Sequence, residues 1–112
     1  MLFRSVPVTT LDAHAKAEGL DRIDFLKIDV EGFELGVLRG ARGLLREKRI
    51  DLIMLEVGDA TCATAGVEPI EVLHELESHG YQLHAIDSEG RVSDRIQSFP
   101  NTTFSANFLA IP

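Results

Sequence analysis

The chain has 112 residues, of which 45% are hydrophobic and 26% are charged, and its formal net charge is −7. This length allows one domain with a moderate core, and the composition is ordinary for a globular protein. The acidic balance argues against nucleic acid and membrane surfaces as partners, because both attract basic patches.

The cysteine content and the hydropathy pattern bear on the compartment. The single cysteine, Cys62, allows no internal disulfide, which fits a reducing compartment and a fold held by packing. We interpret it as a small apolar filler. No stretch approaches the roughly 20 apolar residues of a membrane span, and residues 1–8 lack the layout of a signal peptide. We therefore expect a soluble, cytoplasmic protein.

The first elements of the chain are weakly specified. Residues 6–10, Val-Pro-Val-Thr-Thr, form at most a short or edge strand, because Pro7 cannot donate to a ladder. Thr9 or Thr10 is expected to cap a helix over residues 11–18, with Asp12 in its first turn. Gly19 is expected to end this helix.

Residues 23–29 are the first strong strand. Their near-continuous apolarity is typical of a strand covered on both faces. Gly32 permits a tight turn after this strand. Apolar residues then recur at three- and four-residue spacing from Glu34 onward, which predicts a helix. The glycines within it predict a break near Gly40 that divides it into two short pieces.

The second half of the chain repeats this design. Residues 50–57 are an apolar run that contains Glu56, and residues 58–66 are expected to be a loop of small residues. A helix begins at Glu68-Pro69 and ends at Gly80. Residues 81–87 form a third strand, 88–103 a polar stretch, and 104–111 the last strand.

The order of these elements predicts one α/β domain over residues 1–112. Alternating strands and helices indicate a Rossmann-like, three-layer arrangement with a mostly parallel sheet and helices on both faces. The last two strands follow one another without a helix. We therefore expect them to form a C-terminal antiparallel strand pair at the edge of the sheet.

Acidic residues gather where the first strong strand ends, and ligands of open α/β sheets bind at the carboxyl ends of strands. Asp29 is either a functional acid, able to act as a general base, or a solvated or capping acid. Glu31 and Glu34 either take part in the functional site or are acids of the first helical turn, where a negative charge is favourable. Glu56 ends the neighbouring strand on the same rim. Lys27 is expected to pair with Glu56 or Glu31.

A metal site is compatible with these acids but is not demanded by their spacing. Asp29, Glu31 and Glu56 offer the carboxylate oxygens that hard cations prefer. The four histidines are scattered, and His74 and His79 do not have the i, i+4 spacing of a metal-binding pair. We assign no metal.

The stretch Lys27-Ile28-Asp29-Val30-Glu31-Gly32-Phe33-Glu34, followed by Val37-Leu38-Arg39-Gly40-Ala41, resembles the signature of the FkbM-type methyltransferase family. Three further segments resemble that family: Thr10-Leu11-Asp12, Leu55-Glu56-Val57 and Asn107-Phe108-Leu109-Ala110-Ile111-Pro112. The resemblance covers nearly the whole chain.

The resemblance implies a class I fold that binds S-adenosylmethionine and methylates a hydroxyl oxygen on a small molecule or sugar. It implies that the four strong strands match the fourth to seventh strands of that fold, in the spatial order 4-5-7-6. It assigns roles to six residues, namely Asp29 and Glu31 as catalytic, Glu34, Glu56 and Lys27 as substrate-binding, and Asp12 and Asp29 as cofactor-binding.

The chain departs from the family pattern in its first 30 residues, where no Gly-x-Gly follows a strand. It therefore resembles the C-terminal part of an FkbM-type domain without the glycine-rich cofactor-binding half. Residues 23–29 are then an open strand edge, a template for pairing. Either residues 6–10 fold onto that edge, or another chain covers it, or the fold is marginally stable; for a stable chain we favour a homodimer.

Three functions compete at this stage. The first is an S-adenosylmethionine-dependent O-methyltransferase, or the acceptor-side half of one, which acts on a small hydroxylated molecule. The second is a non-catalytic truncated remnant that acts as an oligomerisation or interaction module through its open strand edge. The third is a module that binds a cation or polyol at the acidic rim without chemistry.

Overall fold

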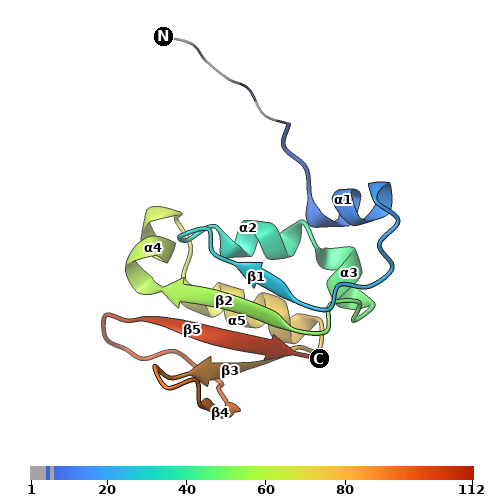
Figure 1. Cartoon of the computed structure of the whole chain (residues 1–112). Helices are drawn as coiled ribbons and strands as arrows, with labels where there is room; N and C mark the ends of the chain where they lie inside the picture. The colour runs from blue at the N-terminus through green and yellow to red at the C-terminus, as the bar shows by residue number, and fades with distance from the viewer. Residues whose placement is uncertain (1–4, 6) are drawn as a thin grey trace.

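A mixed sheet of five strands forms one layer of the protein, and helices pack against it (Figure 1). The computed structural model describes residue 5 and residues 7–112. The helices are α1 (Leu11–Ala17), α2 (Glu34–Arg39), α3 (Arg42–Arg46), α4 (Asp59–Thr64) and α5 (Pro69–Ser78). The strands are β1 (Leu26–Ile28), β2 (Ile53–Gly58), β3 (Gln82–Ile86), β4 (Val92–Arg95) and β5 (Ser105–Ile111).

The strand order is β1-β2-β5-β3-β4. Only β1 and β2 pair in parallel, whereas the β2–β5, β5–β3 and β3–β4 pairs are antiparallel. The predicted spatial order of the four strong strands is therefore confirmed. The prediction of a mostly parallel sheet is wrong, because β5 runs against both of its neighbours and the hairpin strand β4 adds a third antiparallel pair.

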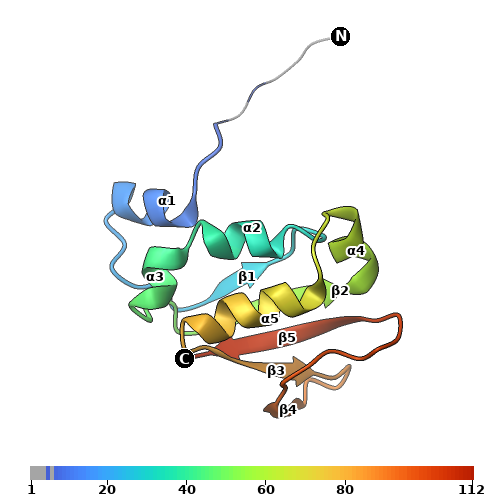
Figure 2. The same ribbon diagram turned by 180° about the vertical axis from the view of Figure 1, so that it is seen from behind.

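The helices that complete the core lie on one face of the sheet. Leu55, Val57, Phe108 and Ala110 point to this face and are buried in a cluster with apolar residues of α2, α3 and α5. Met54 and Glu56 of β2, and Asn107 and Leu109 of β5, face the other side and are exposed or half-buried. Helix α5 crosses behind the sheet in Figure 1 and in front of it in Figure 2. Over the described residues the arrangement has two layers, not the three that were predicted.

The element boundaries follow the local signals closely in the first half. The hydroxyl oxygen of Thr10 accepts a hydrogen bond from the backbone N–H of Ala13 and so caps α1, as expected. The break near Gly40 is confirmed, since α2 and α3 are separate helices. Strand β1 is shorter than the predicted 23–29, and Ile23 makes only an isolated bridge to Ile50.

Two elements were not predicted. Residues 59–64 form α4 in place of the expected loop, because alanine favours the helix and Cys62 supplies a buried anchor. Strand β4 lies within the polar stretch 88–103, where no strand was predicted, and all four of its residues are exposed. It pairs with β3, so the β3–β5 pair is not at the edge of the sheet.

Residues 7–10 do not form the short strand that was predicted there. Val6, within the predicted short strand, lies outside the described residues. No helix in the part of the chain that the structure describes is long and apolar enough to cross a membrane.

The turn between β1 and α2 depends on the absence of a side chain at Gly32. Glu31 has a φ of +48° and Gly32 a φ of +104°, backbone conformations that L residues adopt at a cost. A Cβ on Gly32 would lie 2.1 Å from the carbonyl oxygen of Thr61 in α4. The turn is therefore pressed against α4, and this contact sets where the acidic segment leaves the sheet.

Substitution Gly32→Ala tests this close approach. We expect it to lower the free energy of unfolding by about 2–4 kcal/mol, because the φ is unfavourable and the backbone of α4 must move. The matched control is Gly36→Ala in α2, where a Cβ meets nothing within 4 Å, and this change should stabilise the protein by about 0.5–1 kcal/mol. Urea unfolding of both variants measures the difference, and equal effects would refute the role of the contact.

Candidate functional site

A pocket of about 230 Å³ lies on the open face of the sheet at the carboxyl end of β1. It is lined by residues of β1, β2 and β5, together with the residue that follows β1. The lining residues are Lys27, Ile28, Asp29, Met54, Leu55, Glu56 and Asn107. We call it the rim pocket. It brings together Lys27, Asp29 and Glu56, three of the residues predicted to act at this rim.

Glu56 is held in place from the neighbouring strand. The hydroxyl of Ser105 donates a hydrogen bond to Oε1 of Glu56 at 2.8 Å. Asn107 lies directly opposite Glu56 in the antiparallel β2–β5 register, so its amide shares the same face. Ser105 and Asn107 were not among the predicted site residues, because only the strand register reveals them.

Lys27 reaches the open face without the expected partner. It is exposed in β1, and within the described residues it forms no ion pair with Glu56 or Glu31. A strand covered on both faces would bury the charge of Lys27 and so require an ion pair, but one-sided packing removes that burial cost. Its ammonium group is therefore available beside Asp29, which is also exposed.

The other two acids of the motif lie outside the rim pocket. Glu31 is exposed in the left-handed turn and does not line the pocket. Glu34 is only 2% exposed, and its Oε2 accepts no hydrogen bond within the described chain. The burial of Glu34 is at odds with direct contact to a substrate.

Glu34 instead affects the buried thiol of Cys62. Burial raises the pKa of the Cys62 thiol, and the negative charge of Glu34 raises that pKa further. Cys62 is fully buried, which agrees with its interpretation as a filler residue. A buried thiol with a raised pKa is a poor nucleophile.

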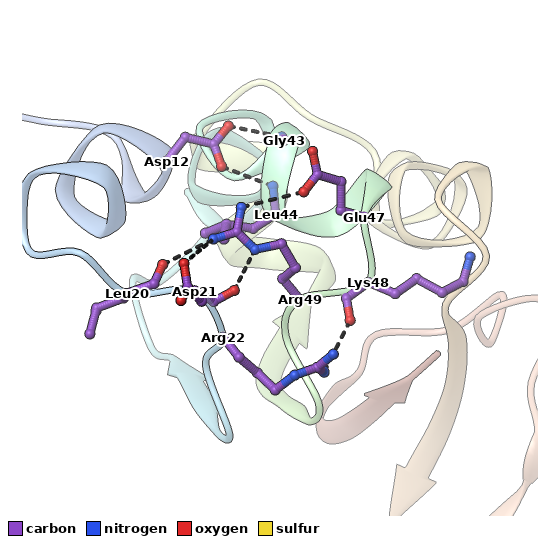
Figure 3. Close-up of polar contacts among 9 residues, drawn as sticks. All are labelled: Asp12, Leu20, Asp21, Arg22, Gly43, Leu44, Glu47, Lys48 and Arg49. Atoms are coloured by element: carbon purple, nitrogen blue, oxygen red, sulfur yellow. Dashed lines mark hydrogen bonds and ion pairs between the residues drawn. The ribbon is translucent and has the colours of Figure 1, made fainter.

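Asp12 has a structural role, because it binds the backbone of α3. Its two carboxylate oxygens accept hydrogen bonds from the backbone N–H groups of Gly43 at 2.8 Å and Leu44 at 3.0 Å (Figure 3). These groups belong to the first turn of α3, so Asp12 fastens α1 to α3. Asp12 does not line the rim pocket, and the geometry lends no support to its predicted contact with a cofactor.

A second pocket, of about 420 Å³, is lined by Asp12 and Arg49, among other residues. The Arg49 guanidinium donates to the backbone carbonyls of Leu20 and Asp21 (Figure 3). It also lies 3.4 Å from a carboxylate oxygen of Glu47. Since these donors of Arg49 are used within the chain, Arg49 connects the segment that follows α1 to the segment between α3 and β2.

The acids do not form a metal site. Among residue 5 and residues 7–112, no three His, Cys, Asp or Glu side chains are grouped closely enough to hold a metal ion. In particular, Glu31 does not join Asp29 and Glu56 at the rim pocket.

A comparison with known protein families shows to which family the chain belongs. The model of the Methyltransferase FkbM domain matches residues 4–83. The chain belongs to the FkbM methyltransferase family. The match includes the motif around Asp29 and the strand that carries Glu56. Neither the curated proteins nor the solved structures gave a match.

The structural role of Asp12 is testable by its removal. We expect Asp12→Ala to lower the free energy of unfolding by about 2 kcal/mol, because two backbone N–H groups of α3 lose a charged acceptor. Asp21→Ala is the control, since the Asp21 side chain is exposed and lies 4.0 Å from Arg49; its effect should stay within about 0.5 kcal/mol. Thermal unfolding of the two variants makes the comparison, and an unchanged Asp12→Ala protein would contradict the assignment.

The burial and the raised pKa of Cys62 predict that its thiol reacts slowly. At pH 8 we expect a thiol reagent to modify the folded chain far more slowly than the unfolded chain, because burial and a raised pKa both suppress the thiolate. The control places the thiol on the exposed side of the same helix by Ala60→Cys together with Cys62→Ala. Rapid labelling of the native chain, at the rate of this control, would show that Cys62 is accessible.

Proposed function

We propose that this FkbM-family chain supplies the acceptor side of an S-adenosylmethionine-dependent O-methyltransferase that acts on a small hydroxylated molecule. The observation that carries the proposal is the meeting of Asp29, Lys27 and Glu56 in one pocket beside the family motif. Family membership supports methyl transfer in general. The chemistry of the pocket supports a hydroxyl acceptor, because its carboxylates accept hydrogen bonds from hydroxyl groups.

Asp29 is the proposed catalytic residue. Its exposed carboxylate lies at the carboxyl end of β1, where it can orient an acceptor hydroxyl and take its proton as oxygen becomes nucleophilic. Glu56, fixed by Ser105, is the second acceptor of hydrogen bonds. Lys27 and the Asn107 amide supply donors on the same face.

The methyl donor itself does not fit the rim pocket. A volume of about 230 Å³ is smaller than the roughly 300–1,000 Å³ of typical ligand pockets, and the sequence contains no Gly-x-Gly to cradle a nucleotide-like group. We therefore assign no step of the reaction to cofactor-binding residues of this chain. The proposal concerns the acceptor and its proton.

Calorimetry with a panel of small hydroxylated molecules, and transfer assays with S-adenosylmethionine that carries a labelled methyl group, test the proposal. The second assay uses a panel of hydroxylated acceptors, and we expect Asp29→Asn to reduce transfer by about 10²–10⁴-fold, the usual contribution of a general base. Asp24→Asn is the matched control, because Asp24 is exposed and lies outside the rim pocket. The absence of binding to any of these acceptors, or methyl transfer that Asp29→Asn leaves unchanged, would overturn the proposal.

A further inference from the structure

A further pocket lies between the start of α5 and the loop that joins β4 to β5. Figure 2 shows both segments at the end of the sheet where β2 leads into α4. The volume of about 550 Å³ is within the roughly 300–1,000 Å³ of typical ligand pockets. Its lining includes Asp59, Glu68, Ile70, Phe99, Thr103 and Phe104. We call it the loop pocket, and it shares no lining residue with the rim pocket.

Contacts within the chain hold the loop against the end of β2. The backbone N–H of Asp59 donates to the carbonyl of Phe104 at 3.2 Å, and Oδ1 of Asp59 accepts from the N–H of Phe104 at 3.2 Å. The ring of Phe99 stacks on that of Phe104 and meets Phe108 edge-on, with 5.3 Å between the ring centroids in both pairs. Phe108 belongs to the buried core. The loop pocket is therefore preformed, and a ligand need not order the loop when it binds.

The apolar part of the lining contains two aromatic rings. Phe99 and Phe104 are half-buried and both line the pocket, so part of each ring is accessible from it. Pro69 and Ile70 of the first turn of α5 extend this apolar lining. Aromatic rings bury large apolar areas and stack on flat groups. The lining therefore suits a ring-shaped ligand with an apolar face.

The charges of the lining exclude anionic ligands. Among the described residues that line the pocket there are two carboxylates and no Lys, Arg or His, so a phosphate or carboxylate would be repelled. The carboxylates do not require a cation. Oδ1 of Asp59 accepts the N–H groups of Ala60 at 2.8 Å and of Phe104. Glu68 is the N-cap residue of α5, where the helix dipole favours a negative charge.

We propose that the loop pocket binds an uncharged ring that carries hydroxyl groups. The apolar face of the ring lies against Phe104, and its hydroxyls donate to the carboxylates of Asp59 and Glu68. The hydroxyl of Thr103 both donates and accepts, which matches a ligand hydroxyl. Pyranose sugars and phenols share this chemistry, because both carry hydroxyls at the edge of a ring with apolar faces. The inference does not rest on the proposed function, since it needs neither the methyl donor nor the rim pocket.

An NMR titration of the isotope-labelled full chain locates binding by residue. The neutral probes are methyl glucopyranoside and resorcinol, and the charged probes are benzyltrimethylammonium and inorganic phosphate. We expect at least one neutral probe to shift the amide signals of Thr103 and Phe104 saturably, and the stronger of the two identifies a sugar or a phenol as the ligand. Raising the ionic strength from about 0.01 M to 1 M should leave this affinity unchanged, because an uncharged ligand has no charge to screen.

Two substitutions test the proposed contacts. Phe104→Leu keeps an apolar side chain but removes the flat ring, and Thr103→Val removes a hydroxyl from an exposed residue with little change of shape. Each should weaken binding of the neutral probe about three- to tenfold, the usual contribution of a ring stack or a hydrogen bond. Phe33→Leu and Thr9→Val are the matched controls, because Phe33 and Thr9 are exposed and lie outside the loop pocket. Both controls should bind as the wild type does, and circular dichroism checks that each variant is folded.

Several outcomes would overturn the inference. One is that neither neutral probe shifts the loop pocket, or that only a charged probe does. Another is that Phe104→Leu and Thr103→Val bind as tightly as their controls. Shifts confined to Asp29 and Asn107 would place the hydroxylated ligand in the rim pocket alone, which would reject this inference and leave the proposed function standing.

Discussion

One-sided packing of the sheet is the constraint on which the rest of this structure depends. Ile53, Leu55 and Val57 of β2 face the helices and are buried. Met54 and Glu56 alternate with them and face the open side, because successive side chains of a strand point to opposite faces. The open face is consequently where polar groups of neighbouring strands meet, and the rim pocket forms on it. The same one-sidedness leaves Lys27 accessible in the middle of an otherwise apolar strand.

The family motif divides into residues that build the turn and residues that reach the open face. Gly32 fits against the carbonyl of Thr61, and Glu34 is buried in the first turn of α2, where its charge raises the pKa of Cys62. Lys27 and Asp29 line the rim pocket instead. The family motif therefore combines two requirements. Some of its residues set the path of the backbone, and others supply polar groups at the end of β1.

The sequence predicts the parts that depend on local signals. The cap at Thr10 and the break near Gly40 follow from capping chemistry and glycine propensity. Other features depend on contacts between distant segments. The sequence does not reveal the pairing of Glu56 with Asn107, because it exists only in the β2–β5 register. It also hides the burial of Glu34, since an acid in a first helical turn reads as solvated.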